Sequence, residues 1–152
     1  TRESILKDAL QSVLGKYKYI IIDTPPSLGL LTINVLTASK SLIIPIQCEY
    51  YALEGLSQLL NTIRLIQKNL NPELNIEGIL ITMFDSRLNM SRQVVSEVKE
   101  YFGEKVYKTI INRNVKLGES PSHGKPIILY DPSSRGSQNY MNLVTEILNQ
   151  NG

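Results

Sequence analysis

The chain of 152 residues has no long apolar run and only one cysteine. No apolar stretch approaches the roughly 20 residues that a helix needs to cross a bilayer, so we expect no transmembrane segment. The N-terminus lacks a charged stretch followed by an apolar one, so no signal peptide is visible, and a first residue of Thr1 rather than Met hints that upstream sequence was removed. Because Cys48 has no second cysteine to pair with, an internal disulfide is excluded and a reducing, intracellular compartment is favoured.

Other common signals of function are also scarce. A net charge of +2 is too weak to indicate nucleic acid by itself, so the argument for DNA must come from where the basic residues lie. His123 has no cluster of Cys or His near it, which argues against a metal centre of clustered ligands. Cys48 has no nearby histidine and is better explained as a small buried residue than as a nucleophile. No Ser-His-Asp pattern and no G-x-S-x-G motif is present.

Short apolar strands alternate with helical segments along the chain. Residues 17–22 predict a strand that is buried on both faces, because Tyr19, Ile20, Ile21 and Ile22 follow one another without polar alternation, and Asp23 ends it. The other predicted elements are helices over about residues 4–14, 30–39, 52–70, 91–102 and 134–149, and strands over residues 42–46, 76–82 and 106–111. This order predicts βαβ units in one α/β domain over residues 1–152, with a mostly parallel sheet and helices on both faces.

The first strand end with unusual sequence is Asp23-Thr24-Pro25-Pro26-Ser27. In open parallel sheets, ligands bind at the carboxyl ends of the strands. An apolar strand that ends in one carboxylate is the Walker B arrangement, in which the carboxylate holds Mg²⁺ directly or through water beside nucleotide phosphates. The two prolines restrict the following turn, as suits a segment that senses the γ-phosphate. The alternative is that Asp23 only caps the next turn, and this fragment alone does not decide between the two.

Two further strand ends carry basic residues. Arg87 and Arg92 lie around the start of a predicted helix and Lys99 lies further along it, which fits either a face for DNA phosphates or an ordinary solvated surface. The loop over residues 112–126 interleaves cations with glycine and proline, and it can present them to a ligand or serve as a polar crossover. Its cationic or titratable residues are Arg113, Lys116, His123 and Lys125.

Four stretches, read together, carry a family resemblance. They are "YKYIIIDTPPSLGLLTINVLTAS", "LIIPIQCEYYALEGLSQLL", "GILITMFDSRLNMSRQVVSEVKEYFGEKVYKTII" and "NRNVKLGESPSHGKPIILYDPSSRGSQNY". In order and spacing they resemble the Walker B and switch II region, the next strand and helix, and the C-terminal half of ParA/Soj-type partition ATPases of chromosomes and plasmids. The resemblance implies a P-loop NTPase-like fold, with ATP and Mg²⁺ as cofactors.

The resemblance also implies roles for individual residues. The nucleotide-binding residues that it implies are Asp23, Thr24, Pro25, Met83, Asn112, Arg113 and Asn114, with Asp23 holding Mg²⁺ through water and Met83 and residues 112–114 near the adenine. The implied contacts to nonspecific DNA are Arg87, Arg113 and Lys116. Asn112 stands where the family usually has proline, and Gly118 and Ser120 depart from the family's common L-S-E-A-P wording. We therefore expect that this loop can differ in shape from that of the family.

The family's phosphate-binding loop, K-G-G-x-G-K-[ST]-[ST], has no counterpart in the chain. Gly29 and Gly55 are isolated, and no G-K-[ST] occurs. The resemblance places that loop and its strand upstream, so we expect the chain to be the C-terminal portion and not to hydrolyse ATP alone. Without the strand that neighbours residues 17–22 in the family, we also expect the chain alone to be unstable, to associate with itself or to be the ordered part of a larger molecule.

The resemblance implies a cytoplasmic, nucleoid-associated ATPase that dimerises on binding ATP, binds DNA without sequence preference and is stimulated by a ParB-type partner. One alternative is a truncated, non-enzymatic DNA-binding or interaction module. Another is a membrane-bound positioning ATPase of the MinD type. The last is disfavoured because the tail "YMNLVTEILNQNG" has no Lys or Arg and does not suit a membrane anchor.

Overall fold

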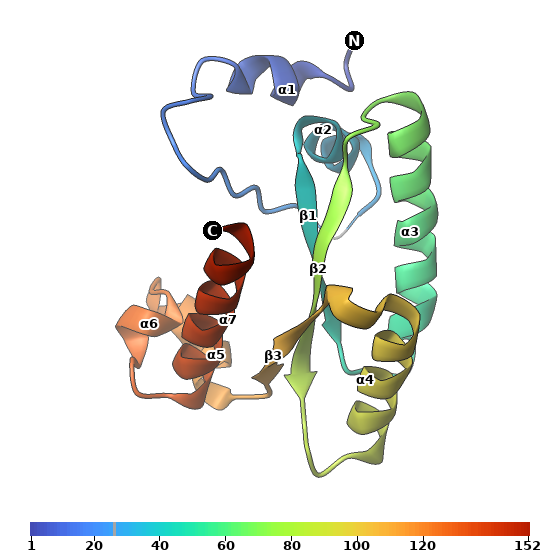
Figure 1. The fold of residues 1–152 in the computed structure, drawn as a ribbon. Coiled ribbons are helices and arrows are strands. Elements are labelled where there is room, and N and C mark those ends of the chain that lie inside the picture. The colour runs from blue at the N-terminus through green and yellow to red at the C-terminus, as the bar shows by residue number, and fades with distance from the viewer. Residues whose placement is uncertain (26) are drawn as a thin grey trace. The chain divides into compact units, whose positions relative to one another are not determined.

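The computed structural model describes residues 1–25 and 27–152, so Pro26 of the predicted turn lies outside the described residues. Strands β1 (Ser41–Gln47), β2 (Asn75–Phe84) and β3 (Val106–Asn112) form one sheet in the order β1-β2-β3 (Figure 1). β2 and β3 are parallel. The predicted α/β class with a parallel sheet is therefore confirmed.

The helices that the hydrophobic periodicity predicts are present. They are α1 (Ile5–Leu10), α2 (Leu30–Ala38), α3 (Ala52–Asn69), α4 (Asn89–Phe102) and α7 (Arg135–Asn151). Short turns of helix that the sequence did not predict are η1 (Gly103–Lys105), α5 (Val115–Glu119), η2 (Ser120–His123) and α6 (Ile127–Tyr130). Each of these is at most five residues long, which is too short for a helical period to show in the sequence.

The chain forms two compact units, residues 1–42 with 54–77 and residues 43–53 with 78–152. In the first unit, α1 lies beside α2 (Figure 1), and the buried side chain of Asn34 joins them. Asn34 Oδ1 accepts the backbone N–H of Leu6 at 3.2 Å, and Asn34 Nδ2 donates to the carbonyl oxygen of Arg2 at 2.8 Å. The first of these bonds satisfies a backbone N–H in the first turn of α1 that the helix itself leaves open.

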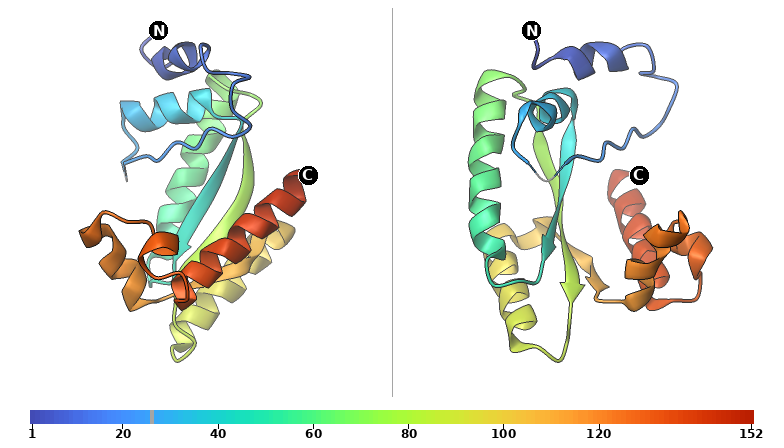
Figure 2. Two further views of the ribbon diagram at one scale, coloured as in Figure 1. Left: turned by 90° about the vertical axis from the view of Figure 1, so that its left-hand side faces the viewer. Right: turned by 180° about the vertical axis from the view of Figure 1, so that it is seen from behind.

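In the second unit, α7 and α4 lie on opposite sides of β3 (Figures 1 and 2). Between α7 and the strands is a core of buried side chains, with further apolar side chains packed against it. The buried residues are Leu80, Tyr107, Ile111 and Leu143, and those packed against them are Leu117, Tyr140 and Ile147. Gly78 leaves the room that Tyr107 fills, since a Cβ atom at position 78 would lie 2.3 Å from the tyrosine ring.

The pairing of β2 with β3 is interrupted by extra residues on each strand. Between the pairs Ile79–Val106 and Ile81–Ile110, two steps along β2 match four along β3, and the next pair, Phe84–Asn112, shows one extra step on β2. Such bulges redirect a strand near its end. The extra step on β2 contains Met83, whose φ of 54° is uncommon for a residue other than glycine.

The predicted strand over residues 17–22 is wrong. These residues are irregular, and the sheet within the described part of the chain consists of β1, β2 and β3. Tyr17 is 68% exposed and Ile21 is 92% exposed, although the apolar run predicts burial on both faces. A strand of that kind needs a hydrogen-bonded neighbour and a covering layer on each face, and residues 17–22 have no such ladder. Asp23 therefore follows an irregular segment rather than a strand.

Candidate functional site

The carboxyl ends of β2 and β3 bring two predicted DNA-binding residues into one region. Phe84 pairs with Asn112, and the backbone N–H of Arg113 donates to the carbonyl oxygen of Phe84 at 2.9 Å. Arg87 follows β2 by three residues and Arg113 follows β3 directly. In the sequence, the two arginines lie in separate regions. The parallel pairing of β2 with β3 places the first residues of their two loops next to each other. We call the exposed region that carries these two side chains the Arg87–Arg113 surface.

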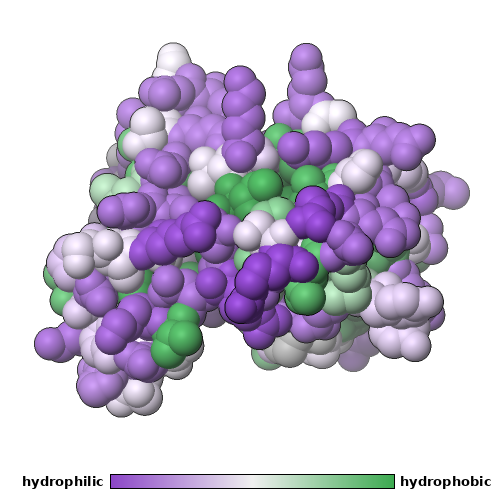
Figure 3. All heavy atoms as spheres, turned by 90° about the horizontal axis from the view of Figure 1, so that it is seen from below, coloured by the Kyte–Doolittle hydropathy of each residue, from purple (hydrophilic) through white to green (hydrophobic). Residues whose placement is uncertain are grey.

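The view from below in Figure 3 shows the end of the molecule toward which β2 and β3 run in Figure 1. Hydrophilic side chains cover much of this face, and hydrophobic ones show between them (Figure 3). A polar face of this kind suits a charged ligand better than an apolar one.

Asp85 holds the guanidinium group of Arg87. Arg87 Nε donates to Asp85 Oδ1 at 3.0 Å, and Arg87 Nη2 donates to Asp85 Oδ2 at 2.8 Å. The backbone N–H of Arg87 also donates to Asp85 Oδ1 at 3.0 Å, which closes the turn. The side chain of Asp85 is 12% exposed and that of Arg87 is 84% exposed. The carboxylate therefore lies beneath a guanidinium group that faces solvent.

This arrangement fixes the charge of Asp85. Hydrogen bonds from the Arg87 side chain and backbone, together with the attraction of Arg87 and Arg113, lower the pKa of Asp85 to about 2. The same partnership raises the pKa of Arg87. Asp85 is thus an anion at neutral pH, and both arginines act on it.

The other predicted basic residues make contacts within the loops. The guanidinium group of Arg92 donates to the carbonyl oxygen of Ser86 and to Asn89 Oδ1, so it helps to build the turn before α4. Lys116 Nζ lies 3.5 Å from Glu119 Oε2, an ion pair between two half-exposed side chains. Exposed pairs of this kind contribute little stability and are weakened by salt. The ion pair with Glu119 therefore restrains Lys116 only weakly.

The same glutamate joins α5 to α6. Tyr130 Oη donates to Glu119 Oε2 at 2.8 Å, which is the main cause of the lowered pKa of Glu119. The ring of His123 stacks on that of Tyr130 with centroids 4.8 Å apart. The loop over residues 112–126, which the sequence predicts to be exposed, is thus stabilised by this hydrogen bond and this ring stacking.

The residues assigned to the nucleotide fall in both units. Asp23, Thr24 and Pro25 are exposed and belong to the first unit, whereas Met83 and residues 112–114 belong to the second. Among the residues that the structure describes, no three His, Cys, Asp or Glu side chains group as a metal site. Mg²⁺ bound to phosphates needs only one or two protein carboxylates and retains several waters, so an exposed carboxylate at Asp23 fits such an ion.

Asn112, which replaces the family's proline, has a partner that the sequence did not reveal. Asn139 Oδ1 on α7 accepts both the backbone N–H of Asn112 at 3.0 Å and Asn112 Nδ2 at 3.1 Å. A proline at position 112 has no N–H to donate, so the first bond depends on this departure. Asn114 caps α5 by accepting the backbone N–H of Lys116. The segment at the end of β3 is therefore fixed by hydrogen bonds to α7 and by the cap of α5.

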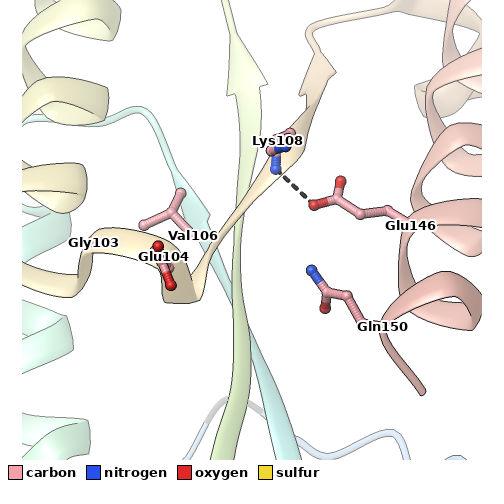
Figure 4. A pocket seen from close by; sticks show the side chains of 6 residues that line it. All are labelled: Gly103, Glu104, Val106, Lys108, Glu146 and Gln150. Carbon is pink, nitrogen blue, oxygen red and sulfur yellow. Dashed lines mark hydrogen bonds between the residues drawn. The ribbon is translucent and has the colours of Figure 1, made fainter. Parts of the chain in front are cut away.

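A hollow of about 530 Å³ lies at the other end of β3 (Figure 4). It is lined by Gly103, Glu104, Val106, Lys108, Glu146 and Gln150. The carboxylate of Glu146 accepts the backbone N–H groups of Lys108 and Thr109, each at 2.8 Å. These donors belong to the extra residues of β3, so Glu146 stabilises the bulge. Sequence reasoning did not single out Glu146, which is 37 and 38 residues away from these partners.

No helix in the described parts of the chain is long and apolar enough to cross a membrane. The parallel sheet and its flanking helices give an α/β fold like that of P-loop NTPases. Residues 1–76, half of the chain, match the family model AAA_31, described as an AAA domain. The chain therefore belongs to this AAA domain family.

Within that family, the chain is homologous to the Soj and ParA chromosome-partitioning proteins, as the sequence predicts. It is 67% identical over 147 residues to the sporulation initiation inhibitor protein Soj of Bacillus subtilis strain 168, covering 97% of the chain and 58% of Soj. It is 58% identical over 147 residues to the chromosome partitioning protein ParA of Myxococcus xanthus, covering 97% of the chain and 52% of ParA. The chain thus spans little more than half the length of these curated relatives.

The chain also resembles a solved structure in both sequence and fold. The cobyrinic acid a,c-diamide synthase of Mycobacterium smegmatis, with bound ATP analog and magnesium, matches with a TM-score of 0.78 and 37% identity. The match covers 97% of the chain and 54% of the synthase. Relatives of this chain therefore include a protein that binds an ATP analog with magnesium.

Proposed function

We propose that the protein containing this chain is a ParA/Soj-type partition ATPase that binds nonspecific DNA through the Arg87–Arg113 surface. It binds ATP with Mg²⁺, dimerises when ATP is bound and releases DNA after hydrolysis stimulated by a ParB-type partner. The observation that carries the DNA-binding step is the pairing of β2 with β3, which starts the Arg87 and Arg113 loops from adjacent points. Two arginines in one region can contact neighbouring phosphates of a duplex.

In this proposal, the nucleotide contacts are the residues that the family resemblance implies. Asp23 supplies the carboxylate for Mg²⁺, and Thr24 and Pro25 form the turn beside the phosphates. Met83, Asn112, Arg113 and Asn114 lie near the base. The left-handed backbone of Met83 supports this assignment, because residues held in sparsely populated conformations cluster at binding sites.

The DNA-binding proposal is tested by charge reversal in the full-length gene product. Arg87→Glu and Arg113→Glu are each compared with Lys105→Glu, which reverses an exposed charge in η1 before β3. We expect each arginine variant to weaken binding to duplex DNA by tenfold or more at about 0.1 M salt, and to reduce the salt slope by about 1. Fluorescence anisotropy over a salt series measures both quantities. Equal affinities for all three variants and the wild type would sink the assignment.

The nucleotide proposal has its own test. Asp23→Ala in the full-length gene product should abolish Mg²⁺-dependent ATP hydrolysis while leaving the salt-dependent affinity for DNA without nucleotide unchanged. A wild-type protein that binds DNA but hydrolyses no ATP would instead favour the non-enzymatic binding module.

A further inference from the structure

The Arg87–Arg113 surface contains a carboxylate that DNA binding does not need. Asp85 forms two hydrogen bonds with the side chain of Arg87, and 12% of the Asp85 side chain is exposed. It also feels the charge of Arg113. Two cations and one anion therefore share this surface, and the anion cancels half of its positive charge.

A second feature concerns the free donors of Arg87. A guanidinium group has five N–H donors, and Asp85 occupies one on Nε and one on Nη2. Three donors remain for an incoming phosphate, so Arg87 can bind DNA without leaving Asp85. The phosphate then approaches with the carboxylate still in place, and the repulsion between the two anions opposes the contact.

We propose that Asp85 limits the affinity of the Arg87–Arg113 surface for DNA phosphates. This inference rests on the proposed DNA binding and adds a regulating residue to the same surface. Holding Arg87 through a bidentate pair gives the side chain one geometry, and the negative charge weakens each phosphate contact. A carboxylate whose only role was to orient Arg87 would raise affinity, whereas one that limits the surface lowers it.

The test compares Asp85→Asn with wild type in the full-length gene product. Asparagine keeps an oxygen for the backbone N–H of Arg87 and removes the charge. Asp85→Ser is a second neutral variant, which also retains an acceptor for that N–H group. We expect both variants to bind duplex DNA on the order of tenfold more tightly at 0.1 M salt, with a salt slope steeper by about 0.9.

Glu100→Gln is the matched control, because it makes the same change in net charge at an exposed site on α4. Glu100 lies eleven residues after the start of α4 at Asn89, about 16 Å along the helix axis. That distance exceeds the screening length of about 10 Å at 0.1 M salt, so we expect less than a twofold effect.

Each outcome has one meaning. Tighter binding by both Asp85 variants, with Glu100→Gln unchanged, supports the inference. Unchanged or weaker binding by the Asp85 variants overturns it, as does an equal gain in Glu100→Gln. If charge reversal at Arg87 and Arg113 leaves binding unchanged, the proposed DNA-binding surface itself fails, so the two failures are distinguishable.

Discussion

In the core of the second unit, the ring of Tyr107 fills the space that a side chain at position 78 would occupy. A Cβ atom at position 78 would lie 2.3 Å from two ring carbons of Tyr107, which is 1% exposed. The rigid ring has to move as a whole, and the surrounding side chains of the core leave little room for it. Position 78 is therefore restricted to glycine by packing and not by backbone conformation.

We expect Gly78→Ala to lower the free energy of unfolding by about 1–3 kcal/mol, the usual cost of overpacking a core. Urea unfolding followed by circular dichroism measures the change. Gly118→Ala is the control, because its Cβ atom would meet nothing within 4 Å and alanine favours the helix α5 that contains it. Equal unfolding midpoints for Gly78→Ala and wild type would contradict the packing argument.

The proposed DNA-binding residues and their partners show what a sequence can indicate at the scale of single residues. Arg87 and Arg113 were identifiable because each follows an apolar strand and matches a family position. Asp85 and Asn139 were not, because their roles depend on which atoms they meet: Asp85 meets a neighbouring guanidinium group, and Asn139 meets a residue 27 positions away. Partnerships of this kind leave no periodic signal in one sequence.

At the scale of elements, the bulge in β3 depends on one carboxylate of α7. The backbone N–H groups of Lys108 and Thr109 both donate to Glu146, and Figure 4 shows the bond from Lys108. Burial acts to raise the pKa of Glu146, but hydrogen bonds from Thr109 and Lys108 outweigh it, and the pKa lies below its ordinary value of 4.5. The ionised carboxylate is thus the form that binds β3.

We expect Glu146→Gln to lower stability at pH 7, because the neutral amide has one acceptor oxygen in place of two and no charge. A group whose pKa is lowered by folding contributes stability above its ordinary pKa and loses it as pH falls through the folded pKa. The difference between Glu146→Gln and wild type should therefore persist at pH 7 and shrink below pH 4.5.

Thermal unfolding between pH 3 and 7 follows that difference, and hydrogen exchange at Lys108 and Thr109 should be faster in the variant. Glu104→Gln, another residue that lines the same hollow, is the control. A difference between Glu146→Gln and wild type that does not change with pH would show that the carboxylate charge is not what holds the bulge.

Most elements could be predicted because apolar periodicity is a local property. The 18 residues of α3 and the 17 of α7 each present several turns of an apolar stripe. The strand predicted over residues 17–22 failed for the opposite reason. An apolar, β-branched run shows that a segment can form a buried strand, but the pairing has to come from a neighbour that the run itself does not specify.

Because residues 17–22 do not form a strand, the chain as a whole carries an exposed apolar segment. Tyr17, Ile20 and Ile21 are 68%, 40% and 92% exposed, and Ile20 and Ile21 belong to the apolar run of residues 19–22. Exposing apolar surface costs about 25 cal/mol for each Å² that remains in contact with water. A segment of high β-propensity with open backbone groups is also a template for pairing with another chain.

We therefore expect residues 1–152, expressed alone, to associate through this segment. Light scattering should give an average mass that rises with concentration, and Ile21→Lys should shift the chain toward the monomer because a charge on the segment opposes pairing. Leu65→Lys is the control: Leu65 is 61% exposed on α3 and lies outside the segment, so its substitution should leave the association unchanged. A wild-type chain that stays monomeric at all concentrations and unfolds cooperatively would show that residues 17–22 are stable in water as they are, and the pairing argument would fail.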